Sequence, residues 1–204
     1  YRALSLRAPA GSVVRLCGPN GAGKTTLMRI ITGLLEPQEG EVLWRGRAIK
    51  ALAGDFRAEL LYIGHMNGVK EELSCLENLR ATAALFGRDA HEAACREALR
   101  LVGLKGFERQ PVRFLSQGQH RRAALARLYL SADVPLWVLD EPFTALDPKG
   151  VSALCRLIEA HAASGGITVM TTHQASDLAA PGYQEFDVSR FAPRRRRARR
   201  CADP

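Results

Sequence analysis

Four short apolar runs occur along the chain, and they predict buried β-strands at residues 12–17, 60–63, 136–139 and 167–170. The first run is interrupted only by Arg15, and the third is continuous. A continuous apolar run is typical of a parallel strand that is covered on both faces. We therefore expect these four segments to be strands of a mostly parallel sheet.

Helical patterns alternate with these runs, and that alternation favours an α/β fold. One helix is expected over residues 24–32, where Gly33 ends it, and another over 149–163, directly before the last strand. The segment 42–46 combines a short apolar run with an Arg-Gly turn and predicts an antiparallel hairpin at the edge of the fold.

The middle of the chain is helical in character. Ser74 and Glu77 have the spacing of a capping box, in which each side chain bonds the other residue's backbone N–H, so a helix should begin there. A second helix is expected to begin at Asp89 and to stop at Gly103. A third is expected over residues 119–129, which are rich in Ala, Leu and Arg.

These elements predict one domain with an inserted helical sub-domain. Residues 1–65 and 132–188 should form the core, residues 66–131 the sub-domain, and residues 189–204 a basic tail. The net charge of +8 resides largely in this tail, because residues 190–204 contain seven arginines and one aspartate. We expect the tail to be solvated and disordered, with contact to anionic lipid or nucleic acid as the alternative.

Composition narrows the class of protein further. The chain has 204 residues, of which 47% are hydrophobic and 25% charged, as in soluble globular proteins. No apolar run approaches the roughly 20 residues of a membrane span. The five cysteines include no C-x-x-C pair, which favours reduced thiols over a disulfide framework or a zinc site.

The glycine-rich turn after the first strand carries the strongest chemical signal. Its pattern, Gly-x-x-x-x-Gly-Lys-Thr between a strand and a helix, is that of a phosphate-binding loop. Glycines let backbone N–H groups surround a polyphosphate, and the following helix adds its positive end. The lysine then supplies charge to the β and γ phosphates, and the threonine can bind Mg²⁺. The predicted nucleotide-binding residues are Gly18, Pro19, Asn20, Gly21, Ala22, Gly23, Lys24, Thr25 and Thr26.

Two carboxylates follow the strand at 136–139. Asp140 at the strand end should lie beside the phosphate-binding loop and help to hold Mg²⁺ together with Thr25. Glu141 comes one residue later, where a carboxylate can polarise the attacking water. Such a pair alone is usually a solvated turn, but beside a phosphate-binding loop the catalytic interpretation is favoured.

The third helix of the insert opens with Leu-Ser-Gln-Gly-Gln. Ser116 is a natural N-cap, and Gly118 leaves room for a ligand to approach the helix N-terminus. From this motif alone a plain capped helix is the better interpretation. The motif residues are Ser116, Gln117, Gly118 and Gln119.

Together, these segments resemble the nucleotide-binding subunits of ABC transporters over residues 4–180. In that family two such domains enclose two ATP molecules, so the resemblance implies a second copy of this chain as a partner. It implies that Ser116 and Gly118, in the family's signature sequence, contact the γ-phosphate held by the opposite subunit. It also assigns Asp147 to the loop that crosses the dimer interface, and His173 to the switch histidine at the γ-phosphate.

The chain departs from the family pattern in two places. Where the family usually has a glutamine that links Mg²⁺ to the membrane partner, this sequence has His65, whose imidazole can offer one lone pair or bridge through water. The family's adenine-stacking aromatic residue lies further upstream than Tyr1 can reach. We therefore expect the chain to be truncated at its N-terminus.

Within the family, the resemblance extends to the ATPase subunits of bacterial haem exporters used in cytochrome c maturation. Segments 62–65, 136–145 and 171–174 carry it. It implies Mg-dependent ATP hydrolysis that powers haem export or the release of a haem complex. It further implies integral membrane transporter subunits as partners and a peripheral position on the cytoplasmic face of the bacterial inner membrane.

Three alternatives remain open at the level of sequence. The chain could serve another ABC exporter, or it could be a soluble ABC ATPase acting on nucleic acid. Only the Arg-rich tail supports the second alternative, and the long coiled-coil arms or tandem ATPase domain typical of such proteins are not present, so no specific nucleic acid is expected. An inactive subunit that uses ATP only to dimerise is disfavoured by Asp140, Glu141 and His173.

Overall fold

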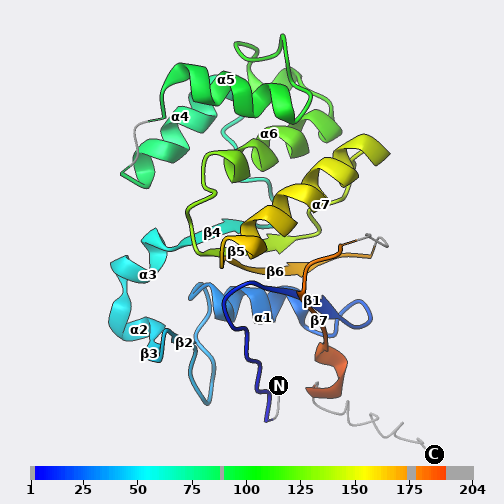
Figure 1. Cartoon of the computed structure of the whole chain (residues 1–204). Helices are drawn as coiled ribbons and strands as arrows, with labels where there is room; N and C mark the ends of the chain where they lie inside the picture. The colour runs from blue at the N-terminus through cyan, green and yellow to red at the C-terminus, as the bar shows by residue number, and fades with distance from the viewer. Residues whose placement is uncertain (1–2, 88–89, 174–177, 192–204) are drawn as a thin grey trace, which may run out of the picture.

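The computed structural model describes residues 3–87, 90–173 and 178–191, and a five-stranded parallel sheet lies at its centre (Figure 1). The strand order is β4, β5, β6, β1, β7, and each neighbouring pair is parallel. The five strands are β1 (Ser12–Cys17), β4 (Leu60–Ile63), β5 (Leu136–Asp140), β6 (Ile167–Thr171) and β7 (Gly182–Asp187). The mostly parallel α/β fold expected from the sequence is confirmed.

Strand β7 was not expected from the sequence. It pairs only with β1, so it forms an edge of the sheet, and none of its residues is fully buried. Because an edge strand can keep polar side chains in solvent, β7 has no apolar run that would predict a strand; its sequence is Gly-Tyr-Gln-Glu-Phe-Asp. The other four strands were predicted because their largely buried side chains form short apolar runs.

Helices and a hairpin complete the described structure. The predicted hairpin is present as β2 (Leu43–Trp44) and β3 (Arg47–Ala48), which pair antiparallel. Two short 3₁₀ turns are η1 (Val112–Phe114) and η2 (Val188–Phe191). The helices are α1 (Lys24–Ile31), α2 (Ile49–Leu52), α3 (Gly54–Ala58), α4 (Cys75–Leu85), α5 (Glu92–Leu101), α6 (Gln117–Tyr129) and α7 (Pro148–Ala163).

Helices cover both faces of the sheet, as Figure 1 shows, with α1 on one side and α6 and α7 on the other. Side chains alternate between the two faces along β5: Leu136 and Val138 pack in the cluster with α1, whereas Trp137 and Leu139 pack in the cluster with α6 and α7. This period of two follows from the strand geometry. The sheet is thus held between two hydrophobic layers, which fixes the positions of its strand ends.

Helix α6 belongs to two hydrophobic clusters at once. Leu125 and Leu128 pack against the sheet, whereas Ala123 and Ala126 pack with α4 and α5 in a separate cluster further from the sheet. Small alanines allow the neighbouring helices to approach closely on that side. Helix α6 therefore connects the outer helices to the sheet, and its N-terminus carries the Ser116 motif.

Some predicted helix boundaries need correction. Helix α5 begins at Glu92 with His91 as its N-cap, later than the expected start at Asp89, which itself lies outside the described residues. Helix α6 begins at Gln117, directly after its cap, and not at residue 119. Residues 189–191 of the predicted tail belong to η2, and residues 192–204 lie outside the described part of the chain.

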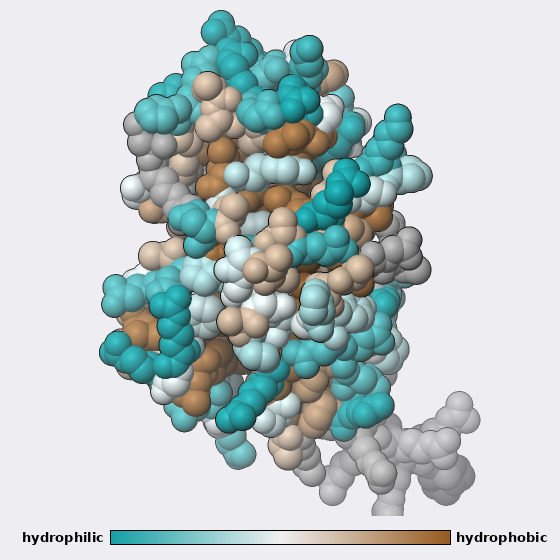
Figure 2. Space-filling view, viewed as in Figure 1, coloured by the Kyte–Doolittle hydropathy of each residue, from teal (hydrophilic) through white to brown (hydrophobic). Residues whose placement is uncertain are grey.

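The surface is chemically mixed on the face shown in Figure 2, where hydrophobic atoms are visible between the upper helices and α7. Within the residues that the structure describes, no helix is long and apolar enough to cross a membrane.

Candidate functional site

The glycine-rich loop after β1 leads directly into α1. Gly18, Gly21 and Gly23 have positive φ angles of 131°, 79° and 101°, a region that residues with a side chain rarely adopt. Gly23 is the N-cap residue of α1, and no side chain caps this helix. Its N-terminus can therefore present backbone N–H groups and the positive end of the helix dipole to an anion. The loop fits the polyphosphate that its sequence predicts.

Lys24 and Thr25, the first two residues of α1, tie the loop to itself and to β5. The Lys24 ammonium donates to the carbonyl oxygens of Gly18 at 2.7 Å and Pro19 at 3.3 Å. The Thr25 hydroxyl donates to Asp140 Oδ2 at 3.3 Å. Because Mg²⁺ prefers hydroxyl, carboxylate and phosphate oxygens as ligands, this pair fits the ion that accompanies a nucleotide phosphate.

Thr171 organises the two carboxylates at the end of β5. Its hydroxyl donates to Asp140 Oδ1 at 2.7 Å and accepts the backbone N–H of Glu141 at 2.9 Å. Thr171 ends β6 and lies opposite Asp140 in the parallel ladder. No sequence pattern assigns this role to Thr171, because threonine is common in β-strands.

The side chain of Glu141 faces His173, which follows β6. Glu141 Oε2 accepts the backbone N–H of His173 at 3.2 Å, and Glu141 Oε1 lies 3.5 Å from His173 Nε2. The Glu141 side chain is 22% exposed and that of His173 is 60% exposed. Both groups are therefore accessible to a ligand while they remain in contact with each other.

These groups line one open cavity of about 430 Å³ at the carboxyl end of the sheet. The predicted site residues from the loop, from β5 and from β6 thus converge on a single space. Gly18, Pro19 and Ala22 belong to the same loop but do not line the cavity. The lining residues are Asn20, Gly21, Gly23, Lys24, Thr25, Thr26, His65, Asp140, Glu141 and His173.

His65 reaches this cavity from the segment that follows β4. Strand β4 lies beside β5 in the parallel sheet, so the residues after both strands emerge at the same edge. The side chain is exposed. The structure thus places an imidazole beside Thr25 and Asp140, where it can bind a metal ion directly or through water.

The Ser116 motif lies away from the cavity that Lys24 lines. The Ser116 hydroxyl accepts the Gln119 backbone N–H at 3.3 Å, and Gln119 Oε1 accepts the Ser116 backbone N–H at 2.8 Å, which makes a complete capping box. A Cβ added to Gly118 would lie 3.1 Å from the carbonyl oxygen of Ala145. The absence of a side chain therefore lets the start of α6 pack closely on the loop that follows β5.

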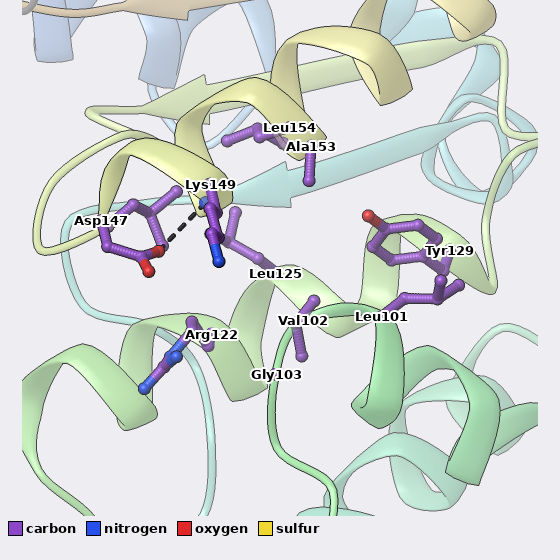
Figure 3. A pocket seen from close by; sticks show the side chains of 12 residues that line it. Leu101, Val102, Gly103, Arg122, Leu125, Tyr129, Asp147, Lys149, Ala153 and Leu154 are labelled. Atoms are coloured by element: carbon purple, nitrogen blue, oxygen red, sulfur yellow. Dashed lines mark hydrogen bonds between the residues drawn. The ribbon is translucent and has the colours of Figure 1, made fainter.

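Asp147 lies at the end of that same loop. It is the N-cap of α7, and its Oδ1 accepts the Gly150 backbone N–H at 3.0 Å (Figure 3). Asp147 lines a second cavity of about 350 Å³ between α5, α6 and α7, which also contains Arg122 and Tyr129. No sequence pattern predicts this second cavity.

No sequence pattern distinguishes Arg121 of α6, which contacts the backbone of Asp140 and Glu141. It is 6% exposed, and its guanidinium donates to the carbonyl oxygens of Asp140 and Glu141. Burial lowers the pKa of Arg121, while the charges of Asp140 and Glu141 act in the opposite direction. Arg121 and Arg122 are adjacent in the sequence, and only the packing of α6 decides which of them points inward.

Fold and site together define a class of protein: a nucleotide-binding domain with a phosphate-binding loop and two carboxylates in the same cavity. A family model described as ABC transporter matches residues 1–144. The cytochrome c biogenesis ATP-binding export protein CcmA of Methylococcus capsulatus is 50% identical over 178 residues, covering 87% of this chain and 86% of that protein. The chain therefore belongs to the ABC transporter family, as one of its ATP-binding subunits. The resemblance inferred from the motifs is confirmed.

Solved structures agree with this assignment. A dimeric cassette of a bacterial ABC transporter has a TM-score of 0.76 at 26% identity, covering 90% of this chain and 84% of that one. A post-hydrolysis dimer of an ATP-binding cassette bound to ADP and phosphate has a TM-score of 0.72 at 26% identity, with the same coverage of both chains.

Proposed function

We propose that this chain hydrolyses MgATP to power a membrane transporter of cytochrome c maturation, exporting haem or releasing it from a complex. The observation that carries the proposal is the 50% identity, over 87% of this chain, to a relative named for ATP-binding export in cytochrome c biogenesis. The cavity beside Lys24 also contains the groups that ATP hydrolysis requires.

The phosphate-binding loop, residues 18–26, holds the phosphates of ATP with its backbone N–H groups. Lys24 adds a positive charge, and its ammonium group is positioned by hydrogen bonds to the carbonyl oxygens of Gly18 and Pro19. Mg²⁺, when bound by Thr25 and Asp140 with His65 as a further candidate, supplies charge neutralisation to the phosphate oxygens.

Glu141 acts as the general base. Its carboxylate lies in the same cavity as Lys24 and Thr25, where it accepts a proton from the water that attacks the γ-phosphate. His173 holds this carboxylate through its backbone N–H and its ring, and its exposed imidazole is available to the γ-phosphate. Ordering of both groups before the substrate arrives lowers the reorganisation cost of the reaction.

The complete site requires a second copy of the chain. Ser116, Gln117, Gly118 and Gln119 do not line the cavity in their own subunit, and the N-terminus of α6 is free to contact ATP held by a partner. Asp147 lies beside that helix and belongs to the interface loop. The dimeric arrangement of a structurally similar bacterial cassette supports this assembly.

The transporter's other partners are integral membrane subunits. The export function in the relative's name supports docking of this chain on such subunits at the cytoplasmic face of the bacterial inner membrane. The chain itself acts as the peripheral ATP-hydrolysing subunit.

Replacement of the general base tests the hydrolytic role. Glu141→Gln keeps the size of the side chain and its contact with the His173 backbone, but it removes the charge that accepts a proton. We expect ATP binding to remain and turnover to fall by roughly 10²- to 10⁴-fold, with an ATP-bound dimer accumulating on gel filtration. Equal turnover in the variant and the parent would refute the assignment of Glu141.

The transport role is tested on the full-length protein purified from membranes in mild detergent. We expect integral membrane proteins to copurify, together with a Soret absorbance band that ATP depletes in the parent but not in Glu141→Gln. If other membrane subunits copurify and no haem is present, the chain serves another ABC exporter and the haem function is wrong. ATPase activity that depends on duplex DNA or RNA would contradict a transporter role.

A further inference from the structure

The guanidinium of Arg121 joins three segments that are far apart in the sequence. Nη2 donates to the carbonyl oxygens of Asp140 at 2.6 Å and Glu141 at 2.9 Å. Nη1 donates to the carbonyl oxygen of Gly64 at 3.2 Å and to Asn67 Oδ1 at 2.9 Å. Both terminal nitrogens of this buried arginine thus find acceptors, which lowers the cost of burying them, whereas Nε is buried without a hydrogen-bond partner among the described residues.

The backbone of Glu141 is in a conformation that its surroundings must maintain. Its φ angle is +50°, in the left-handed region that residues other than glycine rarely adopt. Such a conformation persists only where neighbouring groups hold it. The N–H of Glu141 donates to the Thr171 hydroxyl at 2.9 Å. Its carbonyl accepts from Arg121 at 2.9 Å and from the backbone N–H of Thr144 at 3.2 Å.

This backbone conformation sets the direction of the Glu141 side chain. The carboxylate leaves the end of β5 and turns toward the backbone N–H of His173, on the wall of the cavity. A change in φ of Glu141 would rotate the Cα–Cβ bond and carry the carboxylate away from that position. Arg121 is therefore one of three groups, with Thr171 and Thr144, whose hydrogen bonds to this backbone set the direction of the carboxylate.

The other end of Arg121 fixes the segment that carries His65. Gly64 and Asn67 lie on either side of that histidine, and Arg121 bonds both of them. Arg127, further along α6, donates to the Asn67 carbonyl at 2.7 Å and so holds the same segment. Ser116 caps the same helix. A shift of α6 is therefore transmitted to the His65 segment and to Glu141 together.

We propose that Arg121 is a positioning residue that holds the Asp140–Glu141 backbone in its left-handed turn and thereby couples the position of α6 to the aim of the Glu141 carboxylate. The proposal rests on the function proposed above, in which Glu141 is the general base. Arg121 does not line the cavity that contains Lys24 and Glu141. Its planar, forked donor group reaches two carbonyl oxygens on one side and two acceptors on the other, which a lysine ammonium cannot do.

The first test replaces Arg121 with lysine in the full-length protein, with Arg122→Lys as the matched control. Arg122 is the adjacent residue of the same helix, but its side chain lines the separate cavity between α5, α6 and α7 (Figure 3). We expect Arg121→Lys to lower kcat at least tenfold while KM for ATP changes less than twofold. Arg122→Lys should change neither value by more than twofold. A rise in KM with unchanged kcat in Arg121→Lys would overturn the proposal.

The second test is a double-mutant cycle with Glu141→Gln. If Arg121 acts through Glu141, Arg121→Lys should cause no further loss of the residual turnover in the Glu141→Gln background. A loss of the same factor in both backgrounds would show that Arg121 acts independently of Glu141, and would overturn the inference while leaving the proposed function intact. Full activity of Glu141→Gln alone would instead refute the proposed function.

A milder variant covers the case in which Arg121→Lys fails to fold. Asn67→Ala removes one of the four acceptors of Arg121 and leaves its bonds to Asp140 and Glu141 in place. We expect kcat to fall two- to fivefold, with the thermal unfolding midpoint close to that of the parent. An unchanged kcat in a folded Asn67→Ala protein would refute the coupling to the His65 segment.

Discussion

Glu141 and His173 face each other across the carboxyl ends of two neighbouring strands. The His173 backbone N–H donates to Glu141 Oε2 at 3.2 Å, and His173 Nε2 lies 3.5 Å from Glu141 Oε1. The contact follows from the sheet, because Asp140 and Thr171 are opposite each other in the parallel ladder of β5 and β6. The residues that follow these strands are therefore brought together although they are far apart in the sequence.

Loss of the His173 ring should impair hydrolysis more than binding. His173→Ala keeps the backbone N–H that holds Glu141 but removes the imidazole beside the carboxylate. We expect kcat for ATP to fall roughly 10²-fold, with the dissociation constant for ATP changed only a fewfold. Steady-state ATPase assays and equilibrium binding measure the two quantities.

His91→Ala is the matched control for this variant, because His91 is exposed at the start of α5, outside the nucleotide cavity. Its turnover should equal that of the parent. If both histidine variants lost activity to the same degree, the assignment of His173 would be wrong.

Loss of the Lys24 ammonium should weaken ATP binding itself. A charge-assisted hydrogen bond to phosphate contributes about 1.5–3 kcal/mol, so Lys24→Ala should raise the dissociation constant for ATP by roughly 10- to 100-fold. Titration calorimetry measures this change. Lys50→Ala, which removes an exposed lysine paired with Glu36, should bind ATP like the parent. Normal ATP affinity of Lys24→Ala would contradict the phosphate role.

A bulky charge at Ser116 should block the contact that this residue makes with ATP in the partner subunit, and it should leave ATP binding within its own subunit intact. We expect Ser116→Arg to abolish ATP-dependent dimerisation and turnover while ATP still binds to the monomer, because Ser116 does not line its own subunit's cavity. Analytical ultracentrifugation with ATP, in the Glu141→Gln background, detects the dimer.

Loss of the helix cap also accompanies this substitution, at a cost of about 1 kcal/mol. Ser74→Ala is the control for loss of a cap, because Ser74 is buried and caps α4 with the same capping box. It should lose stability to a similar degree and still form the dimer. A Ser116→Arg protein that dimerises normally would contradict the proposal that Ser116 completes the ATP site of the partner subunit.

A buried histidine makes stability depend on pH. The rings of His161 and Trp137 are stacked, with centroids 3.7 Å apart. His161 Nε2 lies 2.9 Å from the Val134 carbonyl, and Nδ1 lies 3.1 Å from the Thr168 hydroxyl. A carbonyl can only accept, so Nε2 carries the proton of a neutral ring, and Nδ1 accepts from Thr168. Burial lowers the pKa of His161 from its ordinary value of 6.5.

The sign of the pH effect follows from this shift. Between the lowered folded pKa and 6.5, the unfolded chain binds a proton that the folded chain does not, so the free energy of unfolding rises with pH. The contribution of neutral His161 to the free energy of unfolding is fully present above about pH 6.5, and it is lost as the pH falls toward the pKa of His161 in the folded state.

His161→Gln should therefore reduce the decrease in melting temperature on going from pH 7.5 to 5.5, by about 2–4 °C relative to the parent. Trp137 fluorescence follows the unfolding, and His91→Gln serves as the exposed control. An identical pH dependence in parent and His161→Gln would exclude His161 as the titrating group.

The phosphate end of the site could be predicted from the sequence because its signal is local. Residues 18–25 are contiguous, and glycines at positive φ, a lysine and a threonine must occur in that order for a loop to enclose phosphate. Asp140 and Glu141 were identifiable for a similar reason, since a fully buried parallel strand is a continuous apolar run and its end is visible. The capping boxes at Ser74 and Ser116 likewise depend on residues three positions apart.

Packing between distant segments decided the rest. No local pattern distinguishes Arg121 from Arg122, and only the burial of one side of α6 against the ends of β4 and β5 directs Arg121 to Glu141. Thr171 contacts Asp140 and Glu141 only because β6 lies beside β5. The edge strand β7 could not be predicted from the sequence because none of its residues is fully buried, so it has no apolar run. The sequence by itself thus predicted which groups bind phosphate and which carboxylate serves hydrolysis. The tertiary structure decided how the Glu141 carboxylate is aimed, because that aim depends on hydrogen bonds between residues that no sequence spacing brings together.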